Sequence, residues 1–179
     1  MAVTHAAFLR AVNLGATRKA PSAKLVEIFE GVGFSDVATF RTSGNVVFGG
    51  SGSAAGLTRE IEAGLEDGLG FEVPIFLRTA KQLQAIAKQR PFPPRTVKAS
   101  KGKLQVALLL KKPAAKAIRE IEQLATEADH LAIKGTELYW LPSGGTQQSP
   151  LDMKAIDKTA GLNTLRTKGT IEQLHAKFF

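Results

Sequence analysis

The segment DVATFRTSGNVVF, residues 36–48, has the local pattern on which the assignment of the fold rests. Two short apolar runs, DVATFR and NVVF, flank a polar tripeptide, which predicts two β-strands. The tripeptide TSG joins them, and its Gly44 suits the tight turn of a hairpin. We therefore expect a β-hairpin at the centre of the first half of the chain.

Helical patterns lie on both sides of this hairpin. From Ser22 onwards apolar residues recur at helical spacing until Gly31 and Gly33, and LTREIEAGLEDGLG, residues 57–70, again places its apolar side chains on one helix face. The apolar runs at residues 3–11 and 73–77 predict the first and last strands of this half of the chain. The resulting order, β-α-β-β-α-β, is the split βαβ or ferredoxin-like pattern.

The second half of the chain repeats this order as far as a final helix. A strand is expected in KLQVALLL (103–110), a helix after Pro113 and a hairpin in HLAIKGTELYWL (130–141). Ser149 then resembles a helix N-cap, and Thr170 with Gln173 predicts a last short helix.

Between the halves, Thr79 with Gln82 forms a capping box for a further helix, and three prolines within residues 91–94 predict an extended basic linker over 90–102. The expected fold class is α+β, with two tandem ferredoxin-like (split βαβ, α/β-plait) lobes, mainly antiparallel sheets and a linker helix. The expected domains are a lobe at 1–78, a helix and basic Pro-rich linker at 79–102, and a similar lobe with a C-terminal helix at 103–179.

The positive charge of the chain is concentrated in one stretch. The net charge is +8, from 24 Lys and Arg against 16 Asp and Glu, yet residues 73–119 hold twelve basic residues and no acidic one. Such an asymmetry is typical of proteins that contact phosphate-rich partners, although a solvated basic face that aids solubility is the alternative.

Several chemistries are excluded or disfavoured by composition and spacing. The chain has no cysteine, and its three histidines, His5, His130 and His175, have no metal-ligand spacing, so we expect no metal and no bound cofactor. No nucleophile, base and acid constellation is present, which favours a non-enzymatic role. The start of the chain lacks a basic segment before its short apolar run, and no run approaches the ~18 apolar residues of a membrane span, so we expect a cytoplasmic protein without membrane contact.

Two nucleotide-binding patterns are incomplete. The segment GSGSAA, residues 50–55, has the outline of a dinucleotide-binding turn, but Arg78 stands where the acidic ribose partner belongs, so a flexible connector is the preferred interpretation. RNA-recognition modules share the β-α-β-β-α-β order, but their third strand carries several stacking aromatics. The corresponding strand here has a single aromatic residue, Phe48.

The topology itself predicts a candidate anion site. In a split βαβ sheet the first two strands run parallel, so the first helix begins at the edge where both strands end and the third begins. The side chains expected at this edge, which we call the rim, are Arg10, Asn13, Arg18, Lys19, Arg41, Ser43 and Asn45. Free N–H groups at the helix start would add to an anion site there. The alternative is that Asn13 and Ser43 cap turns and the arginines are solvated.

The segments that contain the rim residues also resemble a known protein family. LRAVNLGATRKAPSAKL and VATFRTSGNVVF resemble the bacterial family named domain of unknown function 1697, which reads roughly L-R-G-I-N-V-G-G-x-x-K-x-x-M-x-x-L and T-x-x-x-S-G-N-V-V-F. The matching positions are Leu9, Arg10, Asn13, Gly15, Lys19, Leu25 and residues 43–48. Near the C-terminus, SPLDMKAI and TLRTKGTIEQL are similar to the family's S-K-L and T-x-R-N-x-x-T-x-x-x-L, at Ser149, Leu151, Arg166, Thr170 and Leu174. Ala11, Ala16, Ser22, Thr167 and Lys168 depart from the pattern. The resemblance implies a pair of small α/β lobes and no established activity.

The function expected from these features is binding of an anionic ligand or nucleic acid, through the rim and the basic stretch. The first alternative is an enzyme acting on a phosphorylated or carboxylated small molecule, with Arg10, Lys19 and Arg41 holding the substrate. The second is a homo-oligomeric interaction module in which sheet edges or the terminal Phe178 and Phe179 contact a partner, unless these rings dock onto the chain itself.

Overall fold

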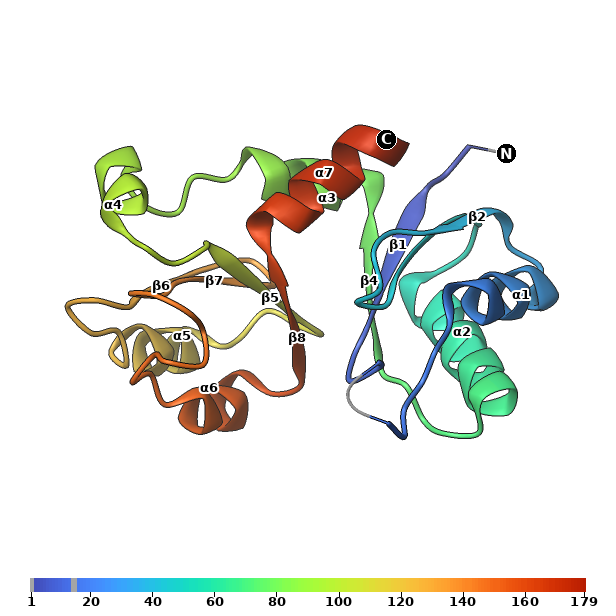
Figure 1. The fold of residues 1–179 in the computed structure, drawn as a ribbon, viewed down its shortest axis with the longest axis horizontal. Helices are drawn as coiled ribbons and strands as arrows, with labels where there is room; N and C mark the ends of the chain where they lie inside the picture. The colour runs from blue at the N-terminus through green and yellow to red at the C-terminus, as the bar shows by residue number, and fades with distance from the viewer. Residues whose placement is uncertain (1, 14–15) are drawn as a thin grey trace. The chain divides into compact units, whose positions relative to one another are not determined.

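The computed structural model describes residues 2–13 and 16–179, and within them it has eight strands and seven helices (Figure 1). Gly15, one of the family-like positions, lies outside the described residues. The chain divides into two compact units, one formed by Met1–Gln84 and Leu174–Phe179 and the other by Ala85–Gln173.

The first unit is built on a four-stranded sheet. Its strands run in the order β2-β3-β1-β4, and each neighbouring pair is antiparallel. The elements are β1 (His5–Leu9), α1 (Ser22–Val32), β2 (Ser35–Thr39), β3 (Asn45–Gly49), α2 (Ala54–Leu69) and β4 (Ile75–Thr79). This order and pairing confirm the predicted ferredoxin-like lobe.

The two helices α1 and α2 pack together and against one face of this sheet (Figure 1). They bury the stripes that the sequence predicted, Leu25, Ile28 and Phe29 on α1 and Leu57, Ile61 and Leu65 on α2. Phe48 of β3 is fully buried and packs edge-on against Phe29, with ring centroids 5.5 Å apart. The single aromatic of β3 is thus part of the core and does not present a base-stacking face.

The second unit repeats the same sheet. Its elements are α4 (Pro94–Ala99), β5 (Gln105–Leu109), α5 (Ala115–Glu122), β6 (His130–Lys134), β7 (Glu137–Leu141), α6 (Met153–Ala160) and β8 (Asn163–Thr167). The strands run in the order β6-β7-β5-β8, again with antiparallel neighbours. The expected pair of tandem ferredoxin-like lobes is therefore confirmed.

The duplication extends to the strand register and to one tripeptide. Thr79 pairs with His5 in the first sheet as Thr167 pairs with Gln105 in the second. The same tripeptide, Leu-Arg-Thr, ends both β4 and β8. Its two arginines, Arg78 and Arg166, are both buried. The repeated order of elements was predicted from the sequence, but this shared tripeptide was not.

Each last strand leads directly into a helix, β4 into α3 (Ala80–Lys88) and β8 into α7 (Lys168–Phe178). The predicted capping box is confirmed: Thr79 N donates to Gln82 Oε1 at 2.9 Å, and Gln82 N donates to Thr79 Oγ1 at 3.3 Å. In α7 the cap is Thr167, whose Oγ1 accepts from Thr170 N at 3.1 Å. Thr170 therefore lies within the helix, and the predicted start at Thr170 is wrong.

Three further features of the linker and the second half differ from the sequence prediction. The strand β8 was not predicted, because NTLRT has few apolar residues and gains its place by pairing with the buried strand β5. The segment 90–102 is not extended throughout, because Pro94 stands at the first position of α4, where its missing N–H is not needed. The N-cap of α6 is Asp152, which accepts from Ala155 N at 2.9 Å, and not Ser149.

The two units divide within α3 and α7, so residues 174–179 belong with the first unit. This division differs from the expected bounds of 1–78, 79–102 and 103–179, in which the whole C-terminal helix was assigned to the second lobe. In the part of the chain that the structure describes, no helix combines the length and apolar character needed to cross a membrane.

Candidate functional site

The rim of the first unit brings together the two segments that the topology predicted to meet. The carboxamide of Asn13, after β1, donates to Thr42 O in the β2–β3 turn at 2.7 Å. Leu9 N at the end of β1 donates to Gly44 O at 2.8 Å. Gly44 has a φ of +69°, and a Cβ there would lie 2.4 Å from Val12, so only glycine permits this contact.

The two asparagines of the rim are engaged within the chain. Asn13 donates to Ala20 O and accepts from Ala20 N at 2.8 Å, which closes the loop before α1. Asn45 is fully buried and donates to Phe40 O at 2.8 Å and to Ser43 Oγ at 2.9 Å. Asn13 therefore performs the turn chemistry of the alternative interpretation, and Ser43, its other member, accepts a hydrogen bond from Asn45 within the same turn.

Arg18 is also held by the protein. Its Nε donates to Ala11 O at 3.0 Å, its guanidinium also donates to Glu72 O, and it lies over the ring of Phe71 at 4.6 Å. Arg18 thus links the loop before α1 to the segment before β4. A guanidinium fixed in this way stabilises the loop and has few donors left for a ligand.

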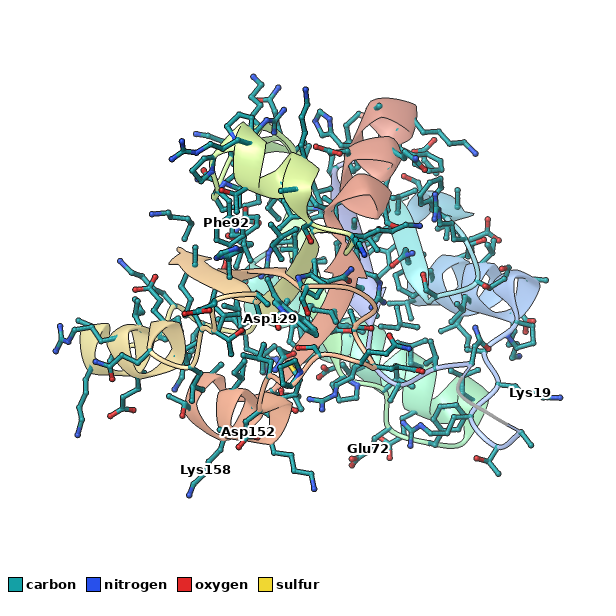
Figure 2. All side chains as sticks on the ribbon, turned by 60° about the vertical axis from the view of Figure 1, so that its left-hand side comes forward. Lys19, Glu72, Phe92, Asp129, Asp152 and Lys158 are labelled. Atoms are coloured by element: carbon teal, nitrogen blue, oxygen red, sulfur yellow. The ribbon has the colours of Figure 1, made fainter. Side chains whose placement is uncertain are left out.

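The remaining rim cations are more accessible. Lys19 is exposed and extends away from the ribbon (Figure 2). Arg41 is exposed and lies 5.5 Å from the ring of Phe40, and Arg10 is half-buried. The first turn of α1 follows Pro21 without a side-chain cap. The rim therefore offers Arg10, Lys19 and Arg41 as its accessible cations.

The C-terminal rings pack on the first unit. The ring of Phe178 meets that of Phe40 edge-on at 6.1 Å, and Lys177 Nζ lies 5.9 Å from the Phe40 ring. Phe179 stacks on His175 at 6.0 Å. Phe178 therefore docks onto its own chain.

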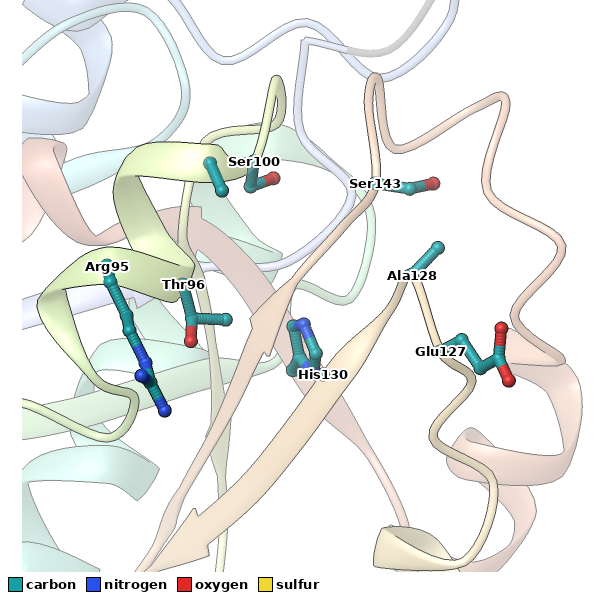
Figure 3. A pocket seen from close by; sticks show the side chains of 8 residues that line it. Arg95, Thr96, Ser100, Glu127, Ala128, His130 and Ser143 are labelled. Atoms are coloured by element: carbon teal, nitrogen blue, oxygen red, sulfur yellow. The ribbon is translucent and has the colours of Figure 1, made fainter.

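A hollow lies in the second unit, between α4 and the start of β6 (Figure 3). It has a volume of about 570 Å³ and is lined by side chains of α4, of the segment before β6, of His130 and of Ser143 after β7. We call it the α4 pocket. Its walls combine one guanidinium, one carboxylate, one imidazole and several hydroxyls, from Arg95, Glu127, His130, Thr96, Ser100 and Ser143.

A buried carboxylate holds two of these walls in place. Asp129 is fully buried and accepts from Trp140 Nε1 at 2.9 Å, from Ser149 Oγ at 2.7 Å and from Ser143 Oγ at 3.4 Å. Its own backbone N–H donates to Thr126 Oγ1 at 2.8 Å, which closes the turn before β6. Burial raises the pKa of Asp129, but the hydrogen bonds from Ser149, Trp140 and Ser143 outweigh this and hold the pKa below its ordinary value. Asp129 is thus an ionised anchor for the loop after β7.

The back of the pocket depends on a close approach of two backbones. Ser100 Oγ donates to Pro142 O at 2.6 Å and accepts from Gly102 N at 3.0 Å. A Cβ at Gly102 would lie 2.3 Å from that same Pro142 oxygen, so a side chain at this position would push the loop away.

The segment that borders the pocket is strongly basic. Arg95 and Lys98 on α4 and Lys101 and Lys103 after it are all exposed, and we call these four residues the α4 basic surface. Within the described ranges none of the four takes part in an ion pair. Arg90, by contrast, lies 3.9 Å from Glu172.

Comparison with known protein families shows to which family the chain belongs. A family model described as "Protein of unknown function (DUF1697)" matches residues 2–139, which is more than half of the chain. The chain belongs to the DUF1697 family. The resemblance found in the rim sequence is thereby confirmed.

This DUF1697 protein is similar in structure to a solved protein described as conserved bacterial protein SP0830 from Streptococcus pneumoniae. The TM-score is 0.77 at 17% sequence identity, and the similarity covers 99% of each chain. At this identity the likeness shows the fold alone. A search of curated proteins finds no match.

Sequence reasoning located the rim of this DUF1697 protein but missed the α4 pocket. His130 is the first residue of the predicted hairpin and Ser149 is a family-like position, but nothing in their spacing joins them to Asp129 or to α4. Among the described residues no group of three His, Asp or Glu side chains is arranged to hold a metal ion.

Proposed function

We propose that this DUF1697 protein binds nucleic acid or a similar polyanion, without catalysis, through the α4 basic surface. The observation that carries the proposal is that Arg95, Lys98, Lys101 and Lys103 are exposed within a short segment and have no acidic partner in the described residues. Cations of this kind are free to exchange their solvent counterions for phosphates.

The rim cations Arg10, Lys19 and Arg41 are a second contact for the same partner in this proposal. Asn13, Arg18, Ser43 and Asn45, which belong to the predicted site, would act by holding the rim loops in place. A cytoplasmic location, where nucleic acids are accessible, is part of the same proposal.

The test is the salt dependence of binding to a fluorescent oligonucleotide duplex, measured by anisotropy with the full chain. The four cations of the α4 basic surface alone give a slope of log K against log salt of about −3.6, which lowers the affinity about 150-fold between 50 and 200 mM salt. Binding that is absent at low salt, or that is insensitive to salt, would refute the proposal.

The rival function, an enzyme for a phosphorylated or carboxylated small molecule, is favoured by one observation, the α4 pocket beside the basic surface. Its size suits a small metabolite. Turnover of phosphorylated or carboxylate-bearing small molecules by the purified protein would establish the enzyme and displace the binding proposal.

A further inference from the structure

An aromatic pair borders the α4 pocket. The ring of Phe92, in the segment before α4, lies beside the imidazole of His130 at the start of β6, with ring centroids 5.9 Å apart and planes tilted by 47°. Both side chains are half-buried, so each keeps an accessible part. His130 also lines the pocket, where Figure 3 shows it beside Thr96 of α4. The hollow therefore has an aromatic ring in its wall, and Phe92 supports that ring.

The groups beside His130 are available to a ligand. Within the described part of the chain, the hydroxyl of Thr96, the guanidinium of Arg95 and the imidazole of His130 make no hydrogen bond to another protein group. The carboxylate of Glu127 points away from α4 in Figure 3, so the α4 side of the hollow is its positively charged side. This side combines an aromatic ring, a hydroxyl and a fixed positive charge.

The positive charge continues along the chain from Arg95. The cations of the α4 basic surface are exposed, and among the described residues none of them takes part in an ion pair. Proteins that bind single-stranded nucleic acid combine such a basic track, which contacts the phosphates, with aromatic rings on which bases stack. Inside a duplex both faces of a base are covered by its neighbours, so the base must leave the stack to enter a pocket. An aromatic ring in a hollow beside a basic track thus favours a single strand.

We propose that the α4 pocket binds a base of single-stranded nucleic acid, stacked on His130, while the neighbouring phosphates contact the α4 basic surface. Thr96 Oγ1 donates to or accepts from the edge of the base, as a hydroxyl can do either. A volume of about 570 Å³ accommodates a base with its sugar. The inference rests on the proposed function and deepens it, because it names a single strand as the polyanion.

The experiment compares a short fluorescent thymidine oligonucleotide with a duplex of the same length. Both are titrated with the full chain, by anisotropy, at about 200 mM salt, where charge contributes least to binding. We expect the single strand to bind about fivefold tighter or more, because it alone supplies a base for stacking. A duplex that binds as tightly as the single strand overturns the inference.

Variants of the ring separate stacking from charge. His130→Leu is expected to weaken binding of the single strand about fivefold or more and to leave binding of the duplex unchanged, whereas His130→Phe retains a ring and restores the affinity. Arg95→Gln weakens both and lowers the salt slope by about 1. The matched control is His175→Leu, because His175 is also half-buried and pairs with a phenylalanine, Phe179, at 6.0 Å. This control should change neither affinity.

A further measurement needs no variant. In the complex of the unaltered protein with the thymidine strand, we expect NMR nuclear Overhauser contacts between base protons and the ring protons of His130. Their absence, or single-strand affinity that His130→Leu leaves intact, overturns the inference. Salt-dependent binding of the duplex in that case leaves the proposed function standing. A uridine oligoribonucleotide of the same length then shows whether RNA or DNA is preferred, since both supply the base.

Discussion

Replacing Asp129 is expected to be among the most destabilising single changes in the second unit. In Asp129→Ala the buried Trp140 Nε1–H, now 2.9 Å from Oδ1, and the Ser149 hydroxyl, now 2.7 Å from it, both lose their acceptor. A hydrogen bond to a charged group contributes about 1.5–3 kcal/mol, and the two are not additive, so we expect a loss of about 3–5 kcal/mol. Asp129→Asn keeps one acceptor oxygen and loses the charge, which costs about 2 kcal/mol.

Urea unfolding followed by tryptophan fluorescence measures this loss directly, because Trp140 is the sole tryptophan of the chain. Circular dichroism of the same samples checks that the transition belongs to the whole unit. Ser149→Ala, which removes only one donor, is the matched control and is expected to cost about 1 kcal/mol. A loss below 1 kcal/mol in Asp129→Ala would refute the assignment of Asp129 as an anchor.

The same carboxylate sets a pH dependence. Because the folded-state pKa of Asp129 lies below its ordinary value, its contribution to stability is present above that ordinary value and is lost as the pH falls through the folded pKa. The unfolding free energy of the native protein should therefore fall below about pH 4, and Asp129→Asn should show a smaller fall. Equal falls in the two proteins would contradict this assignment.

Three other changes test the geometry of the sites. Gly44→Ala should cost about 2–4 kcal/mol by urea unfolding, because its φ is +69° and a Cβ would lie 2.4 Å from Val12; an unchanged midpoint would contradict this contact. Gly102→Ala should displace the loop after β7, because its Cβ would lie 2.3 Å from Pro142 O; unchanged NMR shifts of residues 142–144 would contradict this close approach. Arg10→Gln with Lys19→Gln should elute earlier from heparin with an unchanged unfolding midpoint, whereas unchanged elution would remove the rim from the proposed interface.

The elements that the sequence predicted are those with strong local signals. The stripes of α1 and α2, the hairpin turn at Gly44 and the capping box of Thr79 are all set by residues within a few positions of one another. The strand β8 and the start of α7 were missed because their signal is non-local: NTLRT becomes a strand by pairing with β5, and Thr167 caps the helix only after that strand has formed.

The candidate site also has features that the sequence predicts and features that depend on tertiary contacts. Parallel directions of β1 and β2 were sufficient to predict that the segments of Asn13 and Thr42 meet. Whether a rim side chain is engaged or accessible depends on partners elsewhere, such as Glu72 O for Arg18, and no spacing rule reveals these. The α4 pocket joins residues from 95 to 143 through the tertiary fold, so it could not be found from a motif.

In the proposed function, the charge of the α4 basic surface, and not net charge in general, binds the polyanion. The direct measurement compares two double variants. One carries Lys98→Gln and Lys101→Gln, and the other carries Lys111→Gln and Lys112→Gln. Both pairs remove two exposed lysines from the same unit. We predict that the first pair reduces the salt slope of oligonucleotide binding by about 2 and that the second leaves it unchanged. Equal slopes for the two double variants would contradict binding through the α4 basic surface.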